Sequence, residues 1–359
     1  MKYHFQRINR NPVRTWRWLQ VNDTSLSGEV KDNVLTGVSI KYIPDGFTVR
    51  TFSDERVELS DIGEKQEIAD FSLKNQNTGF EIRLKKGAVQ EEPLVIYVDA
   101  KDDMTALVEN SHITIEEESC GTVIFVYRSH TKEKAFYSGF CQVHVKENAE
   151  CKLVKIQKLS EKDDSVADTK ITVDKNARAD VFCVELGAWQ SISGCEIDLA
   201  GEAAQSTFYS LYVGDKTQRL DMNYRINFKE KKTNGQIVAK GVLQGSCKKT
   251  FRDTLDFQTG AMGAAGREEE ATIVLSEKAR NVSVPLLLCA EEDVAGEHAS
   301  STGKLDEGKI FYLMSRGLSY DEAKLLLVEG AFAEIIKEIP DEKIREELLL
   351  DIGRRLSSS

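Results

Sequence analysis

A single histidine near the end of the chain is the residue best suited to metal chemistry. His298 is the only histidine after residue 144, and it lies in a polar segment that runs from Gly296 to Ser301. A neutral imidazole is the most common protein ligand for metals, and it can also move protons near neutral pH. Because a lone histidine is more often an ordinary surface or capping residue, its role depends on what surrounds it.

Two acidic runs precede this histidine. They are Glu268-Glu269-Glu270 and Glu291-Glu292-Asp293. On the outer face of a parallel β-helix, carboxylates of this kind can form polysaccharide-cleaving sites by acid and base catalysis. Spacing alone does not show whether the two runs meet, so we expect each to be a solvated charged face.

Recognised catalytic motifs are absent from the sequence. It contains no Gly-x-x-x-x-Gly-Lys-Ser/Thr phosphate loop, no Gly-x-Ser-x-Gly nucleophile elbow and no His-Glu-x-x-His zinc helix. The glycine-rich stretch from Gly260 to Gly266 lacks the spacing of a dinucleotide-binding fingerprint. We interpret it as a turn between strands.

The cysteines also give no metal motif. Seven occur singly, at positions 120, 141, 151, 183, 195, 247 and 289, without a Cys-x-x-Cys pair or a Cys/His cluster at zinc spacing. Free cysteines in a reducing compartment are mostly small core residues. We therefore expect these cysteines, Cys289 included, to lie in the core.

Composition narrows the class of protein. The 359 residues include 59 acidic and 48 basic side chains, and the resulting net charge of -11 disfavours a nucleic-acid or anionic-membrane surface. No secretory signal is visible at the start, and the apolar run from Val284 to Ala290 is too short to cross a bilayer. The expected protein is cytoplasmic, with no nucleic-acid or membrane partner.

The elements that must position His298 are suggested by a repeat. Alternating apolar pairs recur at Ile113/Ile115, Val143/Val145, Ile171/Val173, Ile197/Leu199, Ile226/Phe228, Leu255/Phe257 and Ile273/Leu275. The steps between their second members are 30, 28, 26, 29, 29 and 18 residues. Several pairs are followed by a polar turn and a small alanine, such as Ala149 or Ala177. Each unit cannot bury its apolar side alone, so successive units must stack.

This periodicity favours a mainly β fold, a parallel β-helix with a dry aliphatic interior. An antiparallel sandwich would show Asn-Gly or Asp-Gly hairpin turns every ~8–12 residues. The sequence has only Asp45-Gly46 and Asn234-Gly235. The pattern therefore indicates a coiled ladder of parallel strands.

After Gly303 the apolar period changes to that of a helix. A short helix that Arg316-Gly317 would end is followed by the capping box Ser319-Tyr320-Asp321-Glu322. Pro340 ends that second helix, and a third covers roughly 341–356. We expect this C-terminal α-helical domain to cap the unpaired strands at the end of the β-helix.

The last third of the chain resembles a known family. The run from Pro285 to Ala299 (PLLLCAEEDVAGEHA), then Gly303-Lys304-Leu305-Asp306, then the run from Phe311 to Leu318 (FYLMSRGL) closely resembles the signature of the SufB/SufD family of iron–sulfur cluster assembly scaffolds. The resemblance is strong over about 225–340 and extends through the repeat from about 110.

The resemblance implies a fold, partners and site residues. The fold would be a right-handed parallel β-helix with a helical C-terminal domain, and the chain would have no catalysis of its own. SufB would pair with it through the β-helices, and the SufC ATPase would dock on the C-terminal helices. The residues implied for partner binding are Phe311, Tyr312, Arg316 and Gly317. His298 matches the signature histidine, which implies a metal ligand at the SufB junction.

The resemblance also implies the D-type branch of the family. SufB-like chains carry a Cys where this chain has Glu270, and a Glu directly after the signature histidine, where this chain has Ala299. Many D-type chains have a Cys two residues before that histidine, and Gly296 stands there. No cofactor would be bound stably by this chain alone, and a transient iron–sulfur cluster would form at the interface with SufB.

The sequence predicts three segments. These are a short N-terminal segment over 1–55, the β-helix over 56–303 and the SufC-docking helices over 304–359. Two alternatives stay open for the function. One is a purely structural β-helix that forms homodimers, and the other is a carbohydrate-active β-helix enzyme.

Overall fold

The apolar pairs of the repeat lie at the ends of stacked strands. Ile113 and Ile115 end one strand, and Val143 and Val145 lie beside them in register at the end of the next. The computed structural model of the protein describes residues 1–15, 19–31, 37–52, 67–101 and 105–357, so the predicted boundary at residue 55 lies outside the described residues. Strands make up 53% of the chain, and the predicted parallel β-helix is confirmed, with about eight turns.

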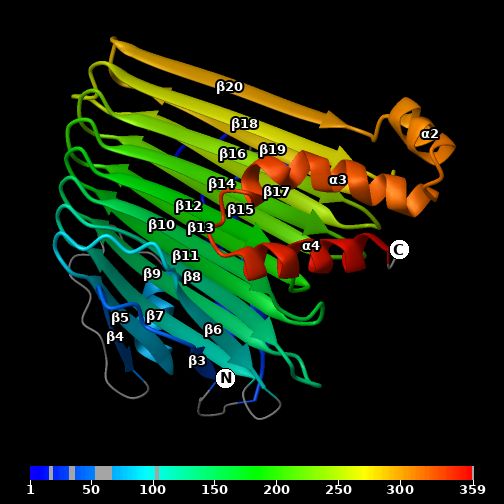
Figure 1. Ribbon diagram of the computed structural model, residues 1–359, viewed down its shortest axis with the longest axis horizontal. Coiled ribbons are helices and arrows are strands. Elements are labelled where there is room, and N and C mark those ends of the chain that lie inside the picture. The colour runs from blue at the N-terminus through cyan, green and yellow to red at the C-terminus, as the bar shows by residue number, and fades with distance from the viewer. Residues whose placement is uncertain (16–18, 32–36, 53–66, 102–104, 358–359) are drawn as a thin grey trace.

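Two sheets of nine strands form the walls of the β-helix (Figure 1). The first, here called the helix-covered sheet, contains β3 (Val38–Ile40), β6 (Leu94–Ala100), β8 (Cys120–Ser129), β10 (Glu150–Lys158), β12 (Arg178–Glu185), β14 (Gln205–Gly214), β16 (Asn234–Leu243), β18 (Ala264–Val274) and β20 (Val294–Gly303) in that spatial order. The second, here called the hairpin-covered sheet, contains β4 (Phe47–Phe52), β5 (Thr78–Leu84), β7 (Ala106–Ile115), β9 (Phe136–Val145), β11 (Asp164–Val173), β13 (Gln190–Leu199), β15 (Arg219–Phe228), β17 (Lys248–Phe257) and β19 (Arg280–Cys289). Neighbours pair in parallel except β3 with β6 and β4 with β5.

The shortest step of the repeat has a structural cause. Ile273 lies in β18 of the helix-covered sheet, whereas the earlier pairs lie in the hairpin-covered sheet. The residues in register with Leu255 and Phe257 are Leu287 and Cys289 of β19. The pair at 273 and 275 is therefore not equivalent to the others, and that part of the predicted repeat is wrong.

The turns between the sheets follow the predicted chemistry. Asn148 and Asn176 adopt left-handed backbone, with φ of 56° and 54°. Asparagine tolerates this region better than most residues that carry a β-carbon. The alanines that follow, Ala149 and Ala177, are fully buried. These corners hold the coils at a constant distance and so keep the strands in register.

The interior of the β-helix is not uniformly aliphatic. Glu109, Lys155 and Glu185 are buried among its apolar rungs. Lys155 Nζ donates a hydrogen bond to Thr169 Oγ1 at 2.9 Å, and Ser191 Oγ donates to Glu185 Oε2 at 2.7 Å. Burial of polar groups is tolerated where they are hydrogen-bonded. The prediction of a dry aliphatic interior is therefore wrong at these coils.

N-terminal elements cover the outer face of the hairpin-covered sheet. An antiparallel hairpin of β1 (Lys2–Ile8) and β2 (Thr24–Glu29) packs there together with α1 (Glu67–Asn75). Tyr3 stacks on Phe136, with ring centroids 3.8 Å apart.

The C-terminal helices are α2 (Glu307–Ser315), α3 (Tyr320–Ile336) and α4 (Glu342–Ser357). Of these, α3 and α4 cover the outer face of the other sheet. Phe332 and Leu348 belong to one apolar cluster with Val184 and Leu211 of the sheet. The predicted capping box of Ser319 and Glu322 is confirmed at the start of α3. Within the described part of the chain, no helix combines the length and apolar character needed to span a bilayer.

The position of these helices corrects one expectation. α3 and α4 lie across the strands of the sheet, α2 lies beyond the end of β20, and none of the three covers the free edge of that final strand (Figure 1). Nearly every residue of β20 is exposed. An apolar outer face, which the outward positions of β8 to β16 create, binds the helices more strongly than a polar strand edge would. β19 and β20 are consequently the uncovered end of the β-helix, here called the open end.

Candidate functional site

His298 lies at the open end, next to a buried acid. β20 pairs with β18 in a register that places His298 beside Glu268. Side chains alternate between the two faces of a strand, and the buried positions of β18 include 264, 266, 268, 270 and 272. Glu268 and His298 therefore share the interior face of the helix-covered sheet. Asp253, a buried residue of β17, approaches them from the opposite sheet.

Asp253, Glu268 and His298 form a compact cluster, here called the acid–histidine cluster. One ligand atom from each residue lies within 4.8 Å of those of the other two. His298 Nδ1 contacts Glu268 Oε2 directly, while Glu268 Oε1 is buried without a hydrogen-bond partner among the described residues. Asp253 and Glu268 are each 2% exposed, whereas the His298 side chain is 37% exposed. Two buried carboxyls therefore lie next to an imidazole that solvent can reach.

The electrostatics of the cluster favour protons or a cation. Burial, followed by the charge of Glu270, raises the pKa of Asp253 to about 8. Burial, followed by the charges of Asp253 and Glu270, raises the pKa of Glu268 to about 9. Neighbouring buried carboxylates cannot both ionise at low cost. A bound divalent cation would supply the compensating charge.

The structure corrects the expectation for the first acidic run. Glu268 and Glu270 are each 2% exposed, so they do not form a solvated charged face. Alternation along β18 explains this, because only Glu269 of the run points to the outer side. An outer-face carbohydrate-cleaving site built on this run is therefore excluded. Glu292 and Asp293 of the second run are exposed, as expected.

A separate ion pair occupies the next position inward. Lys249 Nζ pairs with Glu270 Oε1, and both side chains are almost completely buried. Tyr212 donates to the same carboxylate oxygen at 3.2 Å, and Lys249 Nζ donates to Asn281 Oδ1 at 2.9 Å. Burial opposes ionisation of Glu270, but the Lys249 ammonium outweighs it and lowers the pKa of that carboxyl. Glu270 is thus fixed in a structural pair, unlike Glu268.

The donor set of the acid–histidine cluster suits a divalent transition metal. Imidazole and carboxylate ligands bind Mn²⁺, Fe²⁺ and Zn²⁺. Donors that lie about 2.1 Å from one ion are at most about 4.2 Å apart. The three donor atoms already lie within 4.8 Å of one another. An ion between them would replace the direct contact between His298 and Glu268, so these two side chains would move apart. Three protein donors leave coordination positions for a further ligand.

The structure shows what surrounds two of the positions that distinguish the family branches, Ala299 and Gly296. Ala299 is exposed and adjoins His298 in an extended strand, so it lies on the opposite face from the cluster. A β-carbon at Gly296 would lie 2.9 Å from Leu287 Cδ1, so a larger residue requires that leucine to shift.

The cysteines are only partly as expected. Cys289 is exposed, contrary to the prediction of a core residue, although five other cysteines are buried and Cys120 is partly buried. Cys289 is in register with the buried Phe257, but among the described residues no further strand stacks on β19. The same absence of a next coil explains the exposure of His298.

The four predicted partner-binding residues lie at a different place. Phe311 and Tyr312 of α2 are 75% and 57% exposed. The Arg316 guanidinium lies 5.6 Å from the centre of the Tyr312 ring, and Gly317 takes a left-handed φ of 100° after the helix. In Figure 1, α2 lies beyond the end of β20 and is the least covered of the three C-terminal helices.

Asp253 and Glu268 were not identified as site residues from the sequence. A usable signal was present in both strands. Asp253 interrupts the buried row of Phe251, Leu255 and Phe257, and Glu268 follows the buried Gly266 by two positions. A carboxylate in a row of interior positions indicates a buried acid that needs a partner.

Comparison with known proteins agrees with these features. A family model described as "SUF system FeS cluster assembly, SufBD core domain" matches residues 97–331. The iron–sulfur cluster assembly protein SufD of Bacillus subtilis (strain 168) is 29% identical over 287 residues, which cover 78% of this chain and 64% of that protein. SufB of the same organism is 25% identical over 266 residues, covering 73% of this chain and 56% of SufB.

The chain spans less than two thirds of the length of either relative. A SufBD family protein of Mycobacterium leprae (strain TN), ML0594, is 30% identical over 182 residues, covering 48% of this chain and 46% of that protein. The matched region includes the β-helix from β7 onward, the open end and most of α3. The chain therefore belongs to the SufBD family of iron–sulfur cluster assembly proteins of the SUF system.

Proposed function

We propose that this chain is a non-catalytic, D-type scaffold subunit that pairs with a SufB-type subunit and docks a SufC-type ATPase. The observation that carries the proposal is the open end, where two parallel strands end the β-helix beside the acid–histidine cluster. The absence of family-specific SufB residues at Glu270 and Ala299 supports the D-type assignment.

Pairing at the open end follows from the hydrogen-bonding capacity of its strands. β19 and β20 each have a strand neighbour on one side only within the described structure. Exposed strand edges recruit further strands because their unpaired backbone groups act as a template. Leu287 adds an apolar contact, since it is 45% exposed at this end. A partner β-helix with a similar end would extend both sheets.

The acid–histidine cluster would supply metal ligands at the junction between the two subunits. In the proposed complex, iron is the cargo, and His298 with Glu268 and Asp253 supplies nitrogen and oxygen donors from this side. The partner would supply the remaining ligands, which agrees with the incomplete donor set of the isolated chain. Stable cluster binding by this chain alone is not expected.

Docking of the ATPase is assigned to α2. Its exposed aromatic pair, Phe311 and Tyr312, is the type of surface that dominates protein–protein contacts. α3 and α4 hold α2 in place, because their buried residues attach them to the helix-covered sheet. ATP-driven movement of the docked subunit would therefore reach the β-helix through this attachment.

Co-expression with SufB-type and SufC-type subunits tests the proposal. We expect a complex that survives purification. Leu287→Lys should remove the SufB-type subunit, because it places a charge in the pairing surface, whereas Met262→Lys, at a similarly exposed turn residue, should not. Phe311→Ala with Tyr312→Ala should remove the ATPase only, and Leu350→Ala of α4 is the matched control. Loss of neither subunit from these variants would contradict the proposal.

His298→Ala tests the junction chemistry separately. The complex should assemble normally, because pairing at the edge of β20 uses backbone groups, which the substitution leaves in place. Anaerobic reconstitution should then give less cluster than the unaltered complex. A stable cluster on the isolated chain, or unchanged reconstitution by the variant, would exclude the assigned role.

One alternative rests on the same observation. A second copy of this chain could pair at the open end and give a homodimer. A mixture of this chain with the SufB-type subunit distinguishes the two cases, since we expect the heteromer to replace any homodimer.

A further inference from the structure

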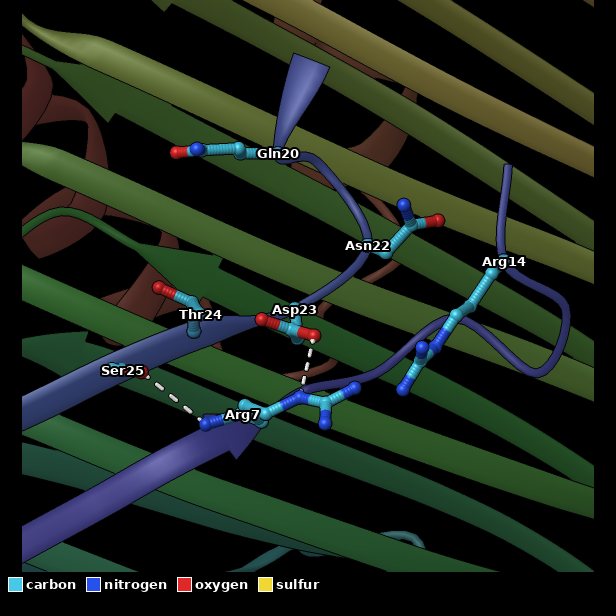
Figure 2. Close-up of a pocket in the computed structure, with 7 residues that line it drawn as sticks. All are labelled: Arg7, Arg14, Gln20, Asn22, Asp23, Thr24 and Ser25. Atoms are coloured by element: carbon cyan, nitrogen blue, oxygen red, sulfur yellow. Dashed lines mark hydrogen bonds and ion pairs between the residues drawn. The ribbon is translucent and has the colours of Figure 1, made fainter. Parts of the chain in front are cut away.

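A hollow on the outer face of the hairpin-covered sheet has features of a ligand site. It is a cavity of about 470 Å³ at the starts of β13, β15, β17 and β19, with Thr24 and Ser25 of β2 on its other side. A second hollow of about 400 Å³ shares Thr24 and Ser25 with the first. Figure 2 shows the residues that line this second hollow. These volumes are typical of small-molecule sites. The two together are here called the hairpin groove.

A ladder of three cations lies in this groove. Arg219, Lys248 and Arg280 begin three successive strands and are in direct register with one another. All three are exposed, and none of them forms an ion pair among the described residues. The Arg219 guanidinium lies 5.2 Å from the centre of the Trp189 ring. Neighbouring strands are about 4.8 Å apart. Like charges directly opposite each other destabilise a sheet, so this arrangement calls for an anion.

The rest of the groove strengthens this charge pattern. Arg14 adds an exposed cation in the second hollow, while Arg7 is paired with Asp23 (Figure 2). Asp221 lines the first hollow, but its carboxylate is bound by the buried Arg252 at 2.6 and 3.0 Å. Hydroxyl groups that could donate to an anion line the same surface at Thr24, Thr217, Ser246 and Thr250. The chain as a whole carries a net charge of -11, so this groove differs from the rest of the surface in its positive charge, which attracts anions.

We propose that the hairpin groove binds a small molecule that carries two or more linked phosphates, of the size of a nucleoside diphosphate. Arg219, Lys248 and Arg280 would hold the phosphates, and the second hollow would take the remainder of the ligand. An acidic peptide fits less well, because side chains on one face of an extended strand repeat at about 6.8 Å, compared with about 4.8 Å for the ladder. The proposal does not depend on partner pairing at the open end.

Calorimetry with the full chain tests this site. Sodium tripolyphosphate and ADP are titrated at low and moderate salt, and both should bind, with affinity that falls as salt rises. Lys248→Gln with Arg280→Gln should weaken tripolyphosphate binding about tenfold to hundredfold, since each lost contact is a charged hydrogen bond. Lys309→Gln with Lys343→Gln removes the same charge from two exposed helix positions and should leave the affinity unchanged.

The remaining outcomes are also decisive. Pyrophosphate is titrated as well, because it has the two phosphates of ADP without the nucleoside. Tighter binding of ADP than of pyrophosphate assigns the second hollow to the nucleoside, and equal affinity assigns the site to the phosphate chain alone. Binding of neither probe, or equal weakening in both double variants, would overturn the proposal. Tighter binding of a poly-glutamate peptide than of tripolyphosphate would replace it with a peptide site. Circular dichroism of each variant shows whether the strands remain folded.

Discussion

At the scale of single residues, the acid–histidine cluster is the feature that most needs an explanation. It contains two acids whose pKa values are raised by burial, an imidazole at the open end and one buried oxygen without a hydrogen-bond partner among the described residues. Proteins rarely keep such an oxygen without a reason. The metal binding that we propose would use all three residues at once.

Metal binding gives the first prediction. The isolated chain should bind Co²⁺ weakly, and Glu268→Gln should lower the affinity about tenfold or more, because a carboxylate ligand and its charge are lost together. Glu269→Gln is the matched control, since Glu269 points to the other side of β18 and pairs with Arg267. Visible absorbance of Co²⁺ follows the titration. Equal affinities for the two variants would remove Glu268 from the site.

The buried pair of Lys249 and Glu270 gives a stability prediction. Lys249→Met should lower the free energy of unfolding by about 3–5 kcal/mol, because it leaves Glu270 charged and buried without its partner. Urea denaturation measures the change. Lys249→Met combined with Glu270→Leu should recover much of the loss, and failure to recover would indicate that packing, not charge, sets the cost.

Asp168 in β11 gives a prediction of pH dependence. Burial, followed by the charge of Glu196, raises its pKa from 3.8 to about 7. The folded state therefore holds a proton that the unfolded state releases, so this residue's contribution to stability falls as pH rises from about 4 to about 7. Asp168→Asn should flatten this decline in thermal melts between pH 5 and pH 8. The exposed Glu150→Gln should leave the decline as it is.

At the scale of the elements, the strand repeat was predictable because its physics is local. Asn148 and Asn176 mark corners, and alternation along each strand marks the buried side. The pairing of Asp253 with Glu268 was not predictable, because it depends on which strands of the two sheets face each other across the interior. Sequence spacing does not give that distance.

The predicted position of the C-terminal helices was wrong for a related reason. Apolar residues of α3 and α4 show that these helices must pack on something, but not on which surface. The outward rows of β8 to β16, such as Val154 and Ile156, were themselves apolar, and a strand apolar on both faces indicates a second layer. That signal is present in the sequence, and it indicates the outer face of this sheet as the surface that the helices cover.

The attachment of α3 gives the fourth prediction. Phe332→Ala should lower the free energy of unfolding by about 3–5 kcal/mol, since Phe332 is fully buried between α3 and the sheet. Leu326→Ala on the same helix should cost much less, because Leu326 is 48% exposed. Denaturant melts compare the two. The ATPase should also dock less firmly on the Phe332 variant, whose α2 has lost its support.

At the scale of the whole molecule, the β-helix is an acidic rod with two different ends. Stability in such stacked structures comes from each coil and its neighbours. The last coil, which contains β19 and β20, has a neighbour on one side only in the described part of the chain and should open most readily.

Hydrogen exchange provides the fifth prediction. Amides of β19 and β20 should exchange faster than those of β15 and β16 in the isolated chain. Addition of the SufB-type subunit should slow exchange in β19 and β20 and leave β15 and β16 unchanged. Protection confined to α2 or to the N-terminal hairpin would place the pairing surface elsewhere.

The two ends of the rod also differ in strand direction. β3 and β4 run antiparallel to their neighbours and close the first coil, whereas β19 and β20 continue the parallel direction of the stack. In the proposed complex two open ends meet, and the ends that then face outward carry the antiparallel strands β3 and β4. Pairing through open ends would use both of them, so assembly by this one contact would stop at a pair.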